Sequence, residues 1–357
     1  MQIERRYSVG FDSEWDVAGV RDMVRAAGRV VLVAHTNADG DAVGSVTGMY
    51  AVIHAVARWR NRAITLTPML PDGVPADLTW LPNTGCILSG RNDAARCRES
   101  IEQADLIIGL DISGPSRTGC LERYLRAATA KKILVDHHEC PEREAYDVVV
   151  SEPRVSSACE LVYWLSMAAF GSEAFTTDAA TSLYAGICTD TGTFSFSNDR
   201  QSVYLAAAEL LQYGIDPMRI NRNIKNIFSV ARMRFFGYAI AHRLEIYDEQ
   251  QVALMVLSAK DMADAGMASS ELTGLINEVM KLKDTDCGIL VREEMSEERP
   301  GEMKIRLSLR SKERYDVNLL AREMFPGGGG HKRAAGATST VSLEETVEIV
   351  KRKLKLK

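Results

Sequence analysis

The chain has 357 residues, which is enough for two domains of ordinary size. Apolar residues make up 46% and charged residues 25%, as expected for a globular protein, and no apolar run is long enough to cross a bilayer. The formal net charge of −5 argues against a protein that coats long DNA or RNA, because such proteins usually present a broad basic surface. A short nucleotide bound in a local pocket is compatible with this charge.

The seven cysteines are scattered along the chain and form no Cys-x-x-Cys pair. An odd number of cysteines without metal-ligand spacing predicts reduced, mostly buried thiols in a cytoplasmic protein. The same spacing argues against a zinc–thiolate site.

The first part of the chain alternates short apolar runs, typical of strands, with longer helical patterns. Continuous apolar strands separated by helices predict a parallel sheet that is covered on both faces. We therefore expect an α/β domain. The alternating segments are 30–34 (strand), 42–59 (helix), 64–70 (strand), 106–110 (strand), 120–130 (helix) and 133–135 (strand).

A helical pattern follows from about 157 to 215 and ends at Gly214, which precedes Asp216–Pro217. The segment 217–243 has the pattern of a helical connector. Beyond it, strand-like runs alternate with helices in a way that is typical of an α+β domain. We predict a first domain at 1–216, a helical linker at 217–243 and a smaller α+β domain at 244–357.

Three of the predicted strands are followed at once by residues that can bind a metal ion. These residues are His35, Asp111 and the pair His137–His138. Ligands of open α/β sheets gather at the carboxyl ends of the strands, so we expect these side chains to converge. Asp190, beside a glycine-containing turn, is expected to join them from a fourth strand end.

The first of these strings reads His35-x-x-x-Asp39-x-Asp41, and its one-residue gap lets two carboxylates from one loop face different ions. Imidazole and carboxylate ligands together suit manganese, magnesium, iron or zinc. Two such ions, about 3.5–4 Å apart and sharing an acidic ligand, would polarise a phosphoryl group and activate a water. Taken singly, these residues would also fit helix caps and turns, but their combination favours a metal site.

Four successive glycines, 327–330, are followed directly by His331, Lys332 and Arg333. Glycines allow the backbone to present N–H groups to an anion, and the adjoining basic residues favour contact with a phosphate or nucleotide over a simple flexible turn. Arg310 is a second candidate phosphate ligand, because a guanidinium can bind two phosphate oxygens at once.

Four strings in chain order resemble the four motifs of the DHH phosphoesterases: AHTNADGDAVGS, GLDISGPSRTG, VDHHEC and GICTDTGTF. Further on, RSK, DVNLLA and GGGGHKRAAG resemble the DHH-associated C-terminal domain. The similarity covers nearly the whole chain, and the most similar group is that of the bacterial nano-RNases (oligoribonucleases) and 3′-phosphoadenosine 5′-phosphate phosphatases. Ala38 stands where many members have proline, which would change the stiffness of the loop and not its ligands.

This resemblance implies a site for two divalent cations, with Mn²⁺ as the expected metal and Mg²⁺ or another ion as the alternative. The implied ligands form two sets that share one bridging residue: His35 and Asp39 for one ion, Asp41, His137 and Asp190 for the other, and Asp111 as the bridge.

The resemblance also implies roles in catalysis and substrate binding. Asp136 would orient a metal ligand, while His138 and Arg117 would contact the scissile phosphate beside the bridging Asp111. The substrate would bind between the two domains. Four residues of the C-terminal domain would hold the far end of the nucleotide: Arg310, Gly329, Gly330 and His331.

The implied activity is metal-dependent hydrolysis of very short oligoribonucleotides to nucleoside 5′-monophosphates, and of 3′-phosphoadenosine 5′-phosphate to AMP. Expected partners are short RNAs and small nucleotides, and neither long nucleic acids nor a membrane. Members of the group are often homodimers, although nothing in the sequence identifies an interface. Four alternatives stay open: a phosphodiesterase of cyclic or linear dinucleotides, an inorganic pyrophosphatase of related architecture, a RecJ-type exonuclease of long single strands and a non-catalytic nucleotide sensor.

Overall fold

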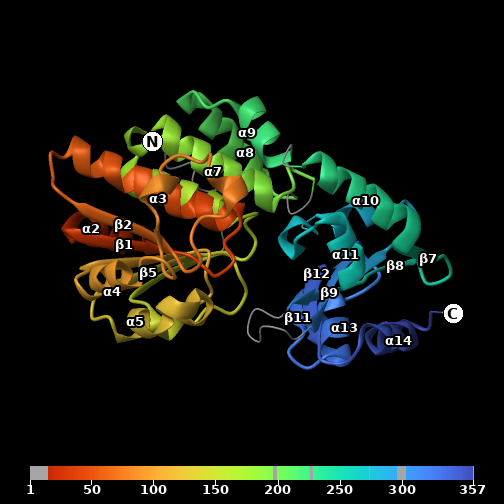
Figure 1. Cartoon of the computed structure of the whole chain (residues 1–357). Helices are drawn as coiled ribbons and strands as arrows, with labels where there is room; N and C mark the ends of the chain where they lie inside the picture. Colours follow the sequence, from red (N-terminus) through yellow and green to blue (C-terminus); the bar gives the residue numbers. More distant parts are fainter. Residues whose placement is uncertain (1–14, 196–198, 226–227, 273, 296–302, 357) are drawn as a thin grey trace. The chain divides into compact units, whose positions relative to one another are not determined.

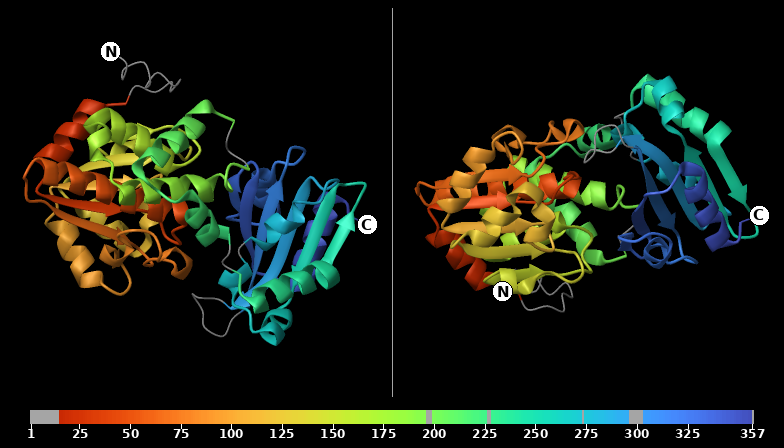
Figure 2. Two further views of the ribbon diagram at one scale, coloured as in Figure 1. Left: turned by 90° about the horizontal axis from the view of Figure 1, so that it is seen from above. Right: turned by 60° about the horizontal axis from the view of Figure 1, so that its bottom comes forward.

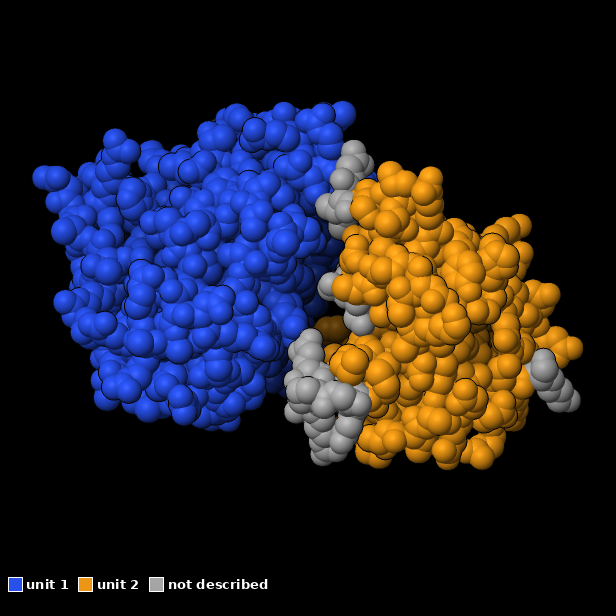
Figure 3. Space-filling model, in the orientation of Figure 1, with its two compact units in different colours: residues 1–227 blue, residues 228–357 orange. Residues whose placement is uncertain are grey.

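The computed structural model describes residues 15–195, 199–225, 228–272, 274–295 and 303–356. It divides into two compact units, residues 1–227 and 228–357 (Figure 3). Each unit has its own sheet (Figure 1). Two helices, α9 (Pro217–Lys225) and α10 (Val230–Arg243), lie inside the range predicted as the linker. The boundary between the units falls between these helices.

Unit 1 contains a parallel sheet of six strands in the order β3-β2-β1-β4-β5-β6, which confirms the predicted parallel sheet. Strands β3 and β6 were not predicted, and β3 is too short to give a periodic signal. The order places β1 beside β4, and such a topological switch point opens a crevice at the carboxyl ends of the strands. The strands are β1 (Arg29–Val33), β2 (Thr65–Leu70), β3 (Leu88–Ser89), β4 (Leu106–Leu110), β5 (Lys131–Asp136) and β6 (Val148–Ser151).

Helices cover both faces of this sheet, as Figure 2 shows. In β1, Leu32 packs into the core beneath α2, α3, α6 and α7, while its neighbour Val31 packs on the opposite face against α4 and α5. Because successive strand residues point to opposite faces, a run of apolar residues is needed to fill both cores. The helices are α2 (Val17–Ala26), α3 (Gly40–Trp59), α4 (Ala94–Glu102), α5 (Glu122–Ala127), α6 (Ala158–Phe170), α7 (Thr177–Asp190) and α8 (Gln201–Leu210).

Unit 2 contains a mixed sheet of six strands in the order β11-β12-β10-β9-β8-β7, with β8 and β9 parallel and the other neighbours antiparallel. The predicted α+β character of this part is confirmed. The glycine run, predicted as a loop, is partly a short edge strand. The strands are β7 (Leu244–Tyr247), β8 (Val252–Leu257), β9 (Cys287–Met295), β10 (Met303–Ser311), β11 (Gly329–His331) and β12 (Ala334–Ser339).

Four helices complete unit 2: α11 (Ala259–Ala265), α12 (Leu275–Val279), α13 (Val317–Met324) and α14 (Leu343–Leu354). Helices α13 and α14 pack on one face of the sheet, over alternate residues of β10 such as Leu307 and Leu309. Helices α10, α11 and α12 pack on the other face, over Met255 and Leu290. Among the described residues of both units, no helix is long and apolar enough to cross a membrane.

Candidate metal centre

The predicted ligands converge at the carboxyl ends of three neighbouring strands in unit 1. His35 lies just beyond β1, Asp111 directly follows β4 and His137 directly follows β5. Strands β1 and β4 flank the topological switch point, where open α/β sheets bind their ligands. The strand order therefore brings together residues that are far apart in the sequence.

The first ligand group consists of His35, Asp39 and Asp111, whose candidate ligand atoms all lie within 4.8 Å of one another. The ring of His35 is oriented by its Nδ1, which lies 2.7 Å from the carbonyl oxygen of Thr36. Its Nε2 then points to the carboxylates, 3.3 Å from Asp111 Oδ2 and 3.9 Å from Asp39 Oδ1. Asp39 also caps α3, because its Oδ1 accepts hydrogen bonds from the N–H groups of Asp41 and Ala42.

Asp41, in the first turn of α3, is only 1% exposed. The first N–H groups of α6 stabilise its charge: Ala158 N donates to Asp41 Oδ2 at 2.6 Å and Cys159 N donates to Oδ1 at 2.8 Å. A helix N-terminus is a natural partner for a carboxylate. This contact could not be predicted from the sequence, because the serine that caps α6, Ser157, precedes an ordinary apolar helix.

The second ligand group consists of Asp41, His137 and Asp190, again with candidate ligand atoms within 4.8 Å of one another. His137 Nε2 lies 3.8 Å from Asp41 Oδ2 and 3.6 Å from Asp190 Oδ2. The prediction that Asp190 follows a strand is wrong. It is the last residue of α7, and the packing of α7 against α3 brings it to the strand ends.

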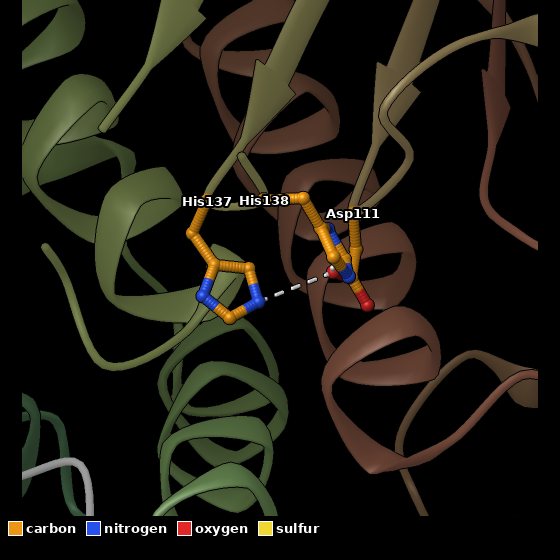
Figure 4. A group of neighbouring side chains, drawn as sticks. All are labelled: Asp111, His137 and His138. Carbon is orange, nitrogen blue, oxygen red and sulfur yellow. Dashed lines mark ion pairs between the residues drawn. The ribbon is translucent and has the colours of Figure 1, made fainter. Parts of the chain in front are cut away.

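Asp111 lies between the two groups. Its Oδ2 faces His35 at 3.3 Å. Its Oδ1 faces His137 at 3.5 Å, and this contact is drawn in Figure 4. Its φ angle of 55° turns the chain sharply after β4, in a region that Asp tolerates better than most residues. Among the described residues, the buried Oδ1 has no hydrogen-bond partner. A buried carboxylate oxygen without a partner, amid imidazole nitrogens and other carboxylates, fits a metal ligand.

Asp136, His138 and Arg117 form a hydrogen-bonded chain beside these groups. His138 Nδ1 lies 2.7 Å from Asp136 Oδ1, and Arg117 Nη1 lies 2.9 Å from His138 Nε2. Arg117 can only donate, so His138 Nε2 accepts and its proton resides on Nδ1, facing the fully buried Asp136.

A third group that could hold a metal contains Asp111, His137 and His138. In the described structure, both ring nitrogens of His138 already have hydrogen-bond partners, whereas His35 and His137 each direct Nε2 at carboxylates. The first group (His35, Asp39 and Asp111) and the second group (Asp41, His137 and Asp190), with Asp111 between them, therefore suit metal binding better than this third group.

The crowded charges shift the pKa values of the metal-free site. Burial lowers the pKa of His35, but Asp111 and Asp39 outweigh it and raise that pKa to about 9. For His137, burial is likewise outweighed by Asp111, Asp41 and Asp190, and its pKa rises to about 10. Burial, together with neighbouring carboxylates, raises the pKa of Asp190 to about 7, although His137 opposes the shift. Without metal, these raised pKa values favour the protonated forms of His35, His137 and Asp190. The same side chains are of types that bind divalent cations once they have lost their protons.

Two family models match the chain in succession. The model described as "DHH family, N-terminal domain" matches residues 29–187, and the model described as "DHHA1 domain" matches residues 249–356. The chain belongs to the DHH family. Five of the six predicted metal ligands fall inside the matched DHH range, and the sixth, Asp190, lies just beyond it.

Similar proteins agree with this DHH assignment. A probable bifunctional oligoribonuclease and PAP phosphatase NrnA from Streptococcus mutans is 27% identical over 328 residues, covering 91% of this chain and 94% of that protein. The cyclic-di-AMP phosphodiesterase GdpP from Bacillus subtilis is 22% identical and covers 93% of this chain, but this chain spans only 48% of it. The crystal structure of an exopolyphosphatase-related protein from Bacteroides fragilis superposes with a TM-score of 0.87 at 28% identity, covering 95% of each chain. As a DHH protein with these relatives, the chain is a phosphoesterase.

The loop that carries Arg117 in this DHH protein is held from two sides. The carbonyl oxygen of Arg117 accepts a hydrogen bond from Thr36 N at 2.9 Å, which joins it to the loop after β1. The hydroxyl of its neighbour Ser116 donates to Glu142 Oε1 at 2.7 Å, and Arg126 donates to the same carboxylate. Sequence reasoning missed Glu142 and Arg126, because neither belongs to a recognisable motif.

The remaining predicted site residues lie together in unit 2. Arg310 on β10 and His331 on β11 both pair with Ala334 of the strand between them, so their side chains lie on the same face of the sheet. Gly330 N donates to Asn318 Oδ1 at 3.0 Å, which fixes the glycine run against α13. The positive φ angles of Gly329 and Gly330, 159° and 148°, explain why glycine is used here.

Proposed function

We propose that this chain is a two-metal phosphoesterase that hydrolyses very short oligoribonucleotides to nucleoside 5′-monophosphates, and 3′-phosphoadenosine 5′-phosphate to AMP. The observation that carries the proposal is the position of Asp111, whose two carboxylate oxygens face two separate ligand groups. The relative from Streptococcus mutans, named as an oligoribonuclease and PAP phosphatase, supports the choice of substrates.

We propose that the site holds two divalent cations, both Mn²⁺. One would be held by His35, Asp39 and Asp111, and the other by Asp41, His137, Asp190 and the same Asp111. The two ions would polarise the phosphoryl group and lower the pKa of a water. The chain's own residues supply the remaining functions. The two N–H groups at the α6 N-terminus hold Asp41 in place, and the carbonyl of Thr36 orients His35.

Arg117 and His138 are proposed to contact the scissile phosphate, and the N–H groups of Arg117 that do not bond His138 are proposed to stabilise the negative charge that develops on the phosphoryl oxygens. Both are polar groups at the edge of the ligand cluster, and hydrogen bonds that aim donors at such charge lower the barrier. Asp136 holds His138 in one tautomer and does not itself contact the substrate. Arg310, Gly329, Gly330 and His331 are proposed to bind the nucleotide portion of the substrate. We further propose a cytoplasmic, homodimeric enzyme.

A phosphodiesterase of cyclic or linear dinucleotides is the second candidate. The match to the cyclic-di-AMP phosphodiesterase from Bacillus subtilis favours it, since that protein also aligns along most of this chain. The same metal centre would serve either reaction, so only the substrate distinguishes the candidates.

Product analysis decides between them. The full chain is incubated with Mn²⁺ and end-labelled RNAs ranging from a dinucleotide to a long oligomer, and in parallel with 3′-phosphoadenosine 5′-phosphate and a cyclic dinucleotide. Our proposal predicts mononucleotides from the shortest RNAs, release of AMP from 3′-phosphoadenosine 5′-phosphate, and survival of the longest RNA. If only the cyclic dinucleotide is cleaved, the proposed oligoribonuclease function is wrong and the second candidate, a dinucleotide phosphodiesterase, replaces it.

A further inference from the structure

One face of the unit 2 sheet is covered by helices over only part of its width. On this face, α10, α11 and α12 pack chiefly over β8 and β9, where Met255 and Leu290 are buried. Over β10 and β12 the same face is more open: Arg306 and Gly336 are exposed, and Ser308 is half-buried. A pocket of about 340 Å³ lies here within unit 2, between Arg292, Arg306, Ser308, Gly327, Gly336 and Thr338.

The open part of the face is basic along one edge and flat along the other. Alternate residues of β10 point to this face, and all four are basic or hydroxylic: Lys304, Arg306, Ser308 and Arg310. Arg292 of β9 pairs directly with Arg306 and lies on the same face. We call these five residues the basic strip. The partners of β10 on β12 are small, Ala334, Gly336 and Thr338, which leaves a shallow groove beside the strip.

The basic strip carries a surplus of positive charge. Glu294 lies 2.9 Å from Arg306 Nε, 3.2 Å from Arg292 Nε and 3.6 Å from Lys304 Nζ. Three cations around one carboxylate leave two positive charges unbalanced. Glu294 thereby holds both guanidiniums in place, while each has further N–H donors beyond those used in these contacts.

The strip also has a suitable repeat. Two residues of an extended strand and one nucleotide of an extended RNA contain the same number of backbone bonds, so their repeats are similar in length. Alternate residues of β10 can therefore face successive phosphates of a single strand, with Ser308 between the cations Arg310 and Arg306. The strip begins at Arg310, beside His331, where the proposed function places the nucleotide portion of the substrate.

We propose that Arg306 and Arg292 of the basic strip bind the phosphates of nucleotides beyond the second, and that they make the enzyme prefer short oligonucleotides over dinucleotides. This inference rests on the proposed function, which it extends to substrate length. Arg292 and Arg306 are the residues that set this preference. A dinucleotide is too short to reach them from Arg310, so its binding does not depend on them.

The test uses the full chain and two variants, Arg306→Gln and Arg292→Gln. A matched control, Arg352→Gln, removes an exposed arginine of α14, which packs on the opposite face of the sheet. Binding of a fluorescently labelled adenylate dinucleotide and pentanucleotide is measured in EDTA, and their kcat/KM values are measured with Mn²⁺. Each strip variant should weaken pentanucleotide binding about tenfold, the loss expected for one charge-assisted contact. A plot of log affinity against log salt concentration should become less steep, with the magnitude of its negative slope smaller by about 0.7 per lost phosphate contact.

A third strip variant, Gly336→Val, fills the groove without changing its charge and should also weaken binding of the pentanucleotide but not of the dinucleotide. An added Cβ at Gly336 would have Leu307 O as its nearest neighbour, at 3.5 Å, so the strand can accept it. Equal losses for both oligonucleotides, or no loss in any strip variant, would overturn the inference and leave the proposed function intact. Conversely, if the wild type cleaves neither RNA but the strip variants still weaken pentanucleotide binding, the strip stands and the proposed function fails.

Discussion

The carboxylate of Asp41 accepts a hydrogen bond from the backbone N–H of Cys159, a residue 118 positions further along the chain. This contact fixes a proposed metal ligand on α3 against the first turn of α6. The Cys159 thiol also donates to the Asp41 carbonyl oxygen at 3.4 Å. A Cβ on Gly186 of α7 would lie only 2.2 Å from Cys159 Sγ, so glycine is needed for this close approach. Three helices therefore determine where one carboxylate points.

Loosening the first turn of α6 should weaken metal binding. Ser157→Ala removes the N-cap hydroxyl that accepts a hydrogen bond from Glu160 N, at an expected cost of about 1 kcal/mol in the free energy of unfolding. Because the same turn orients Asp41, affinity for Mn²⁺ should fall by about tenfold, as for other residues that support metal ligands. Calorimetric titration with Mn²⁺ measures this affinity.

The control for that variant is Ser342→Ala, which removes the equivalent cap of α14 in unit 2. It should cost a similar amount of stability while leaving Mn²⁺ affinity unchanged. Equal Mn²⁺ affinities in the two variants would show that the α6 terminus does not support the metal site.

Removing the shared ligand should abolish catalysis. Asp111→Ala deletes the carboxylate that faces both ligand groups, and the lost stabilisation of several kcal/mol corresponds to a fall in kcat of about a thousandfold or more. Turnover of a dinucleotide is measured over a wide range of Mn²⁺ concentration, with the exposed Asp77→Asn as the control. Activity that returns at high Mn²⁺ would contradict the bridging role.

Asp136→Asn should separate the positioning of His138 from metal binding. An asparagine can offer its amide N–H to His138 Nδ1, which would place the imidazole proton on Nε2 and oppose the contact with Arg117. We expect kcat to fall by about 10–100-fold while Mn²⁺ affinity stays near that of the wild type. A loss of Mn²⁺ affinity as large as the loss of kcat would make Asp136 a support of the metal site instead.

The metal-free protein should become less stable as the pH rises above neutrality. Despite burial, neighbouring carboxylates raise the pKa of His35 to about 9 and that of His137 to about 10, against about 6.5 for an unfolded histidine. Such groups stabilise the fold fully below about pH 6.5, and their contribution is lost as the pH rises through the folded pKa. Tm in EDTA should therefore fall between about pH 7 and pH 10.

Saturating Mn²⁺ should reverse this trend, because the ligands must lose their protons and the metal then binds more tightly at higher pH. Thermal melts with EDTA and with Mn²⁺ across this pH range provide the comparison. A Tm in EDTA that rises with pH would mean that these histidines are not paired with carboxylates.

Much of the fold and the site followed from local sequence. The apolar runs before His35, Asp111 and His137 identified central strands, and the residue type at each strand end identified the ligands. The contact between Asp41 and α6 had no such signal, because it arises from the packing of distant helices. Asp190 was assigned to a strand end although its surroundings have a helical pattern, and it proved to end α7. The glycine run forms part of β11, an edge strand without the alternation that reveals most strands.

The position of the bound ions tests the central claim most directly. Crystals grown with Mn²⁺ would be measured for anomalous scattering, which locates manganese independently of the protein atoms. We predict two peaks: one among His35, Asp39 and Asp111, and one among Asp41, His137 and Asp190, with Asp111 contacting both. A single peak among Asp111, His137 and His138, the third group able to hold a metal, would contradict the two-metal account.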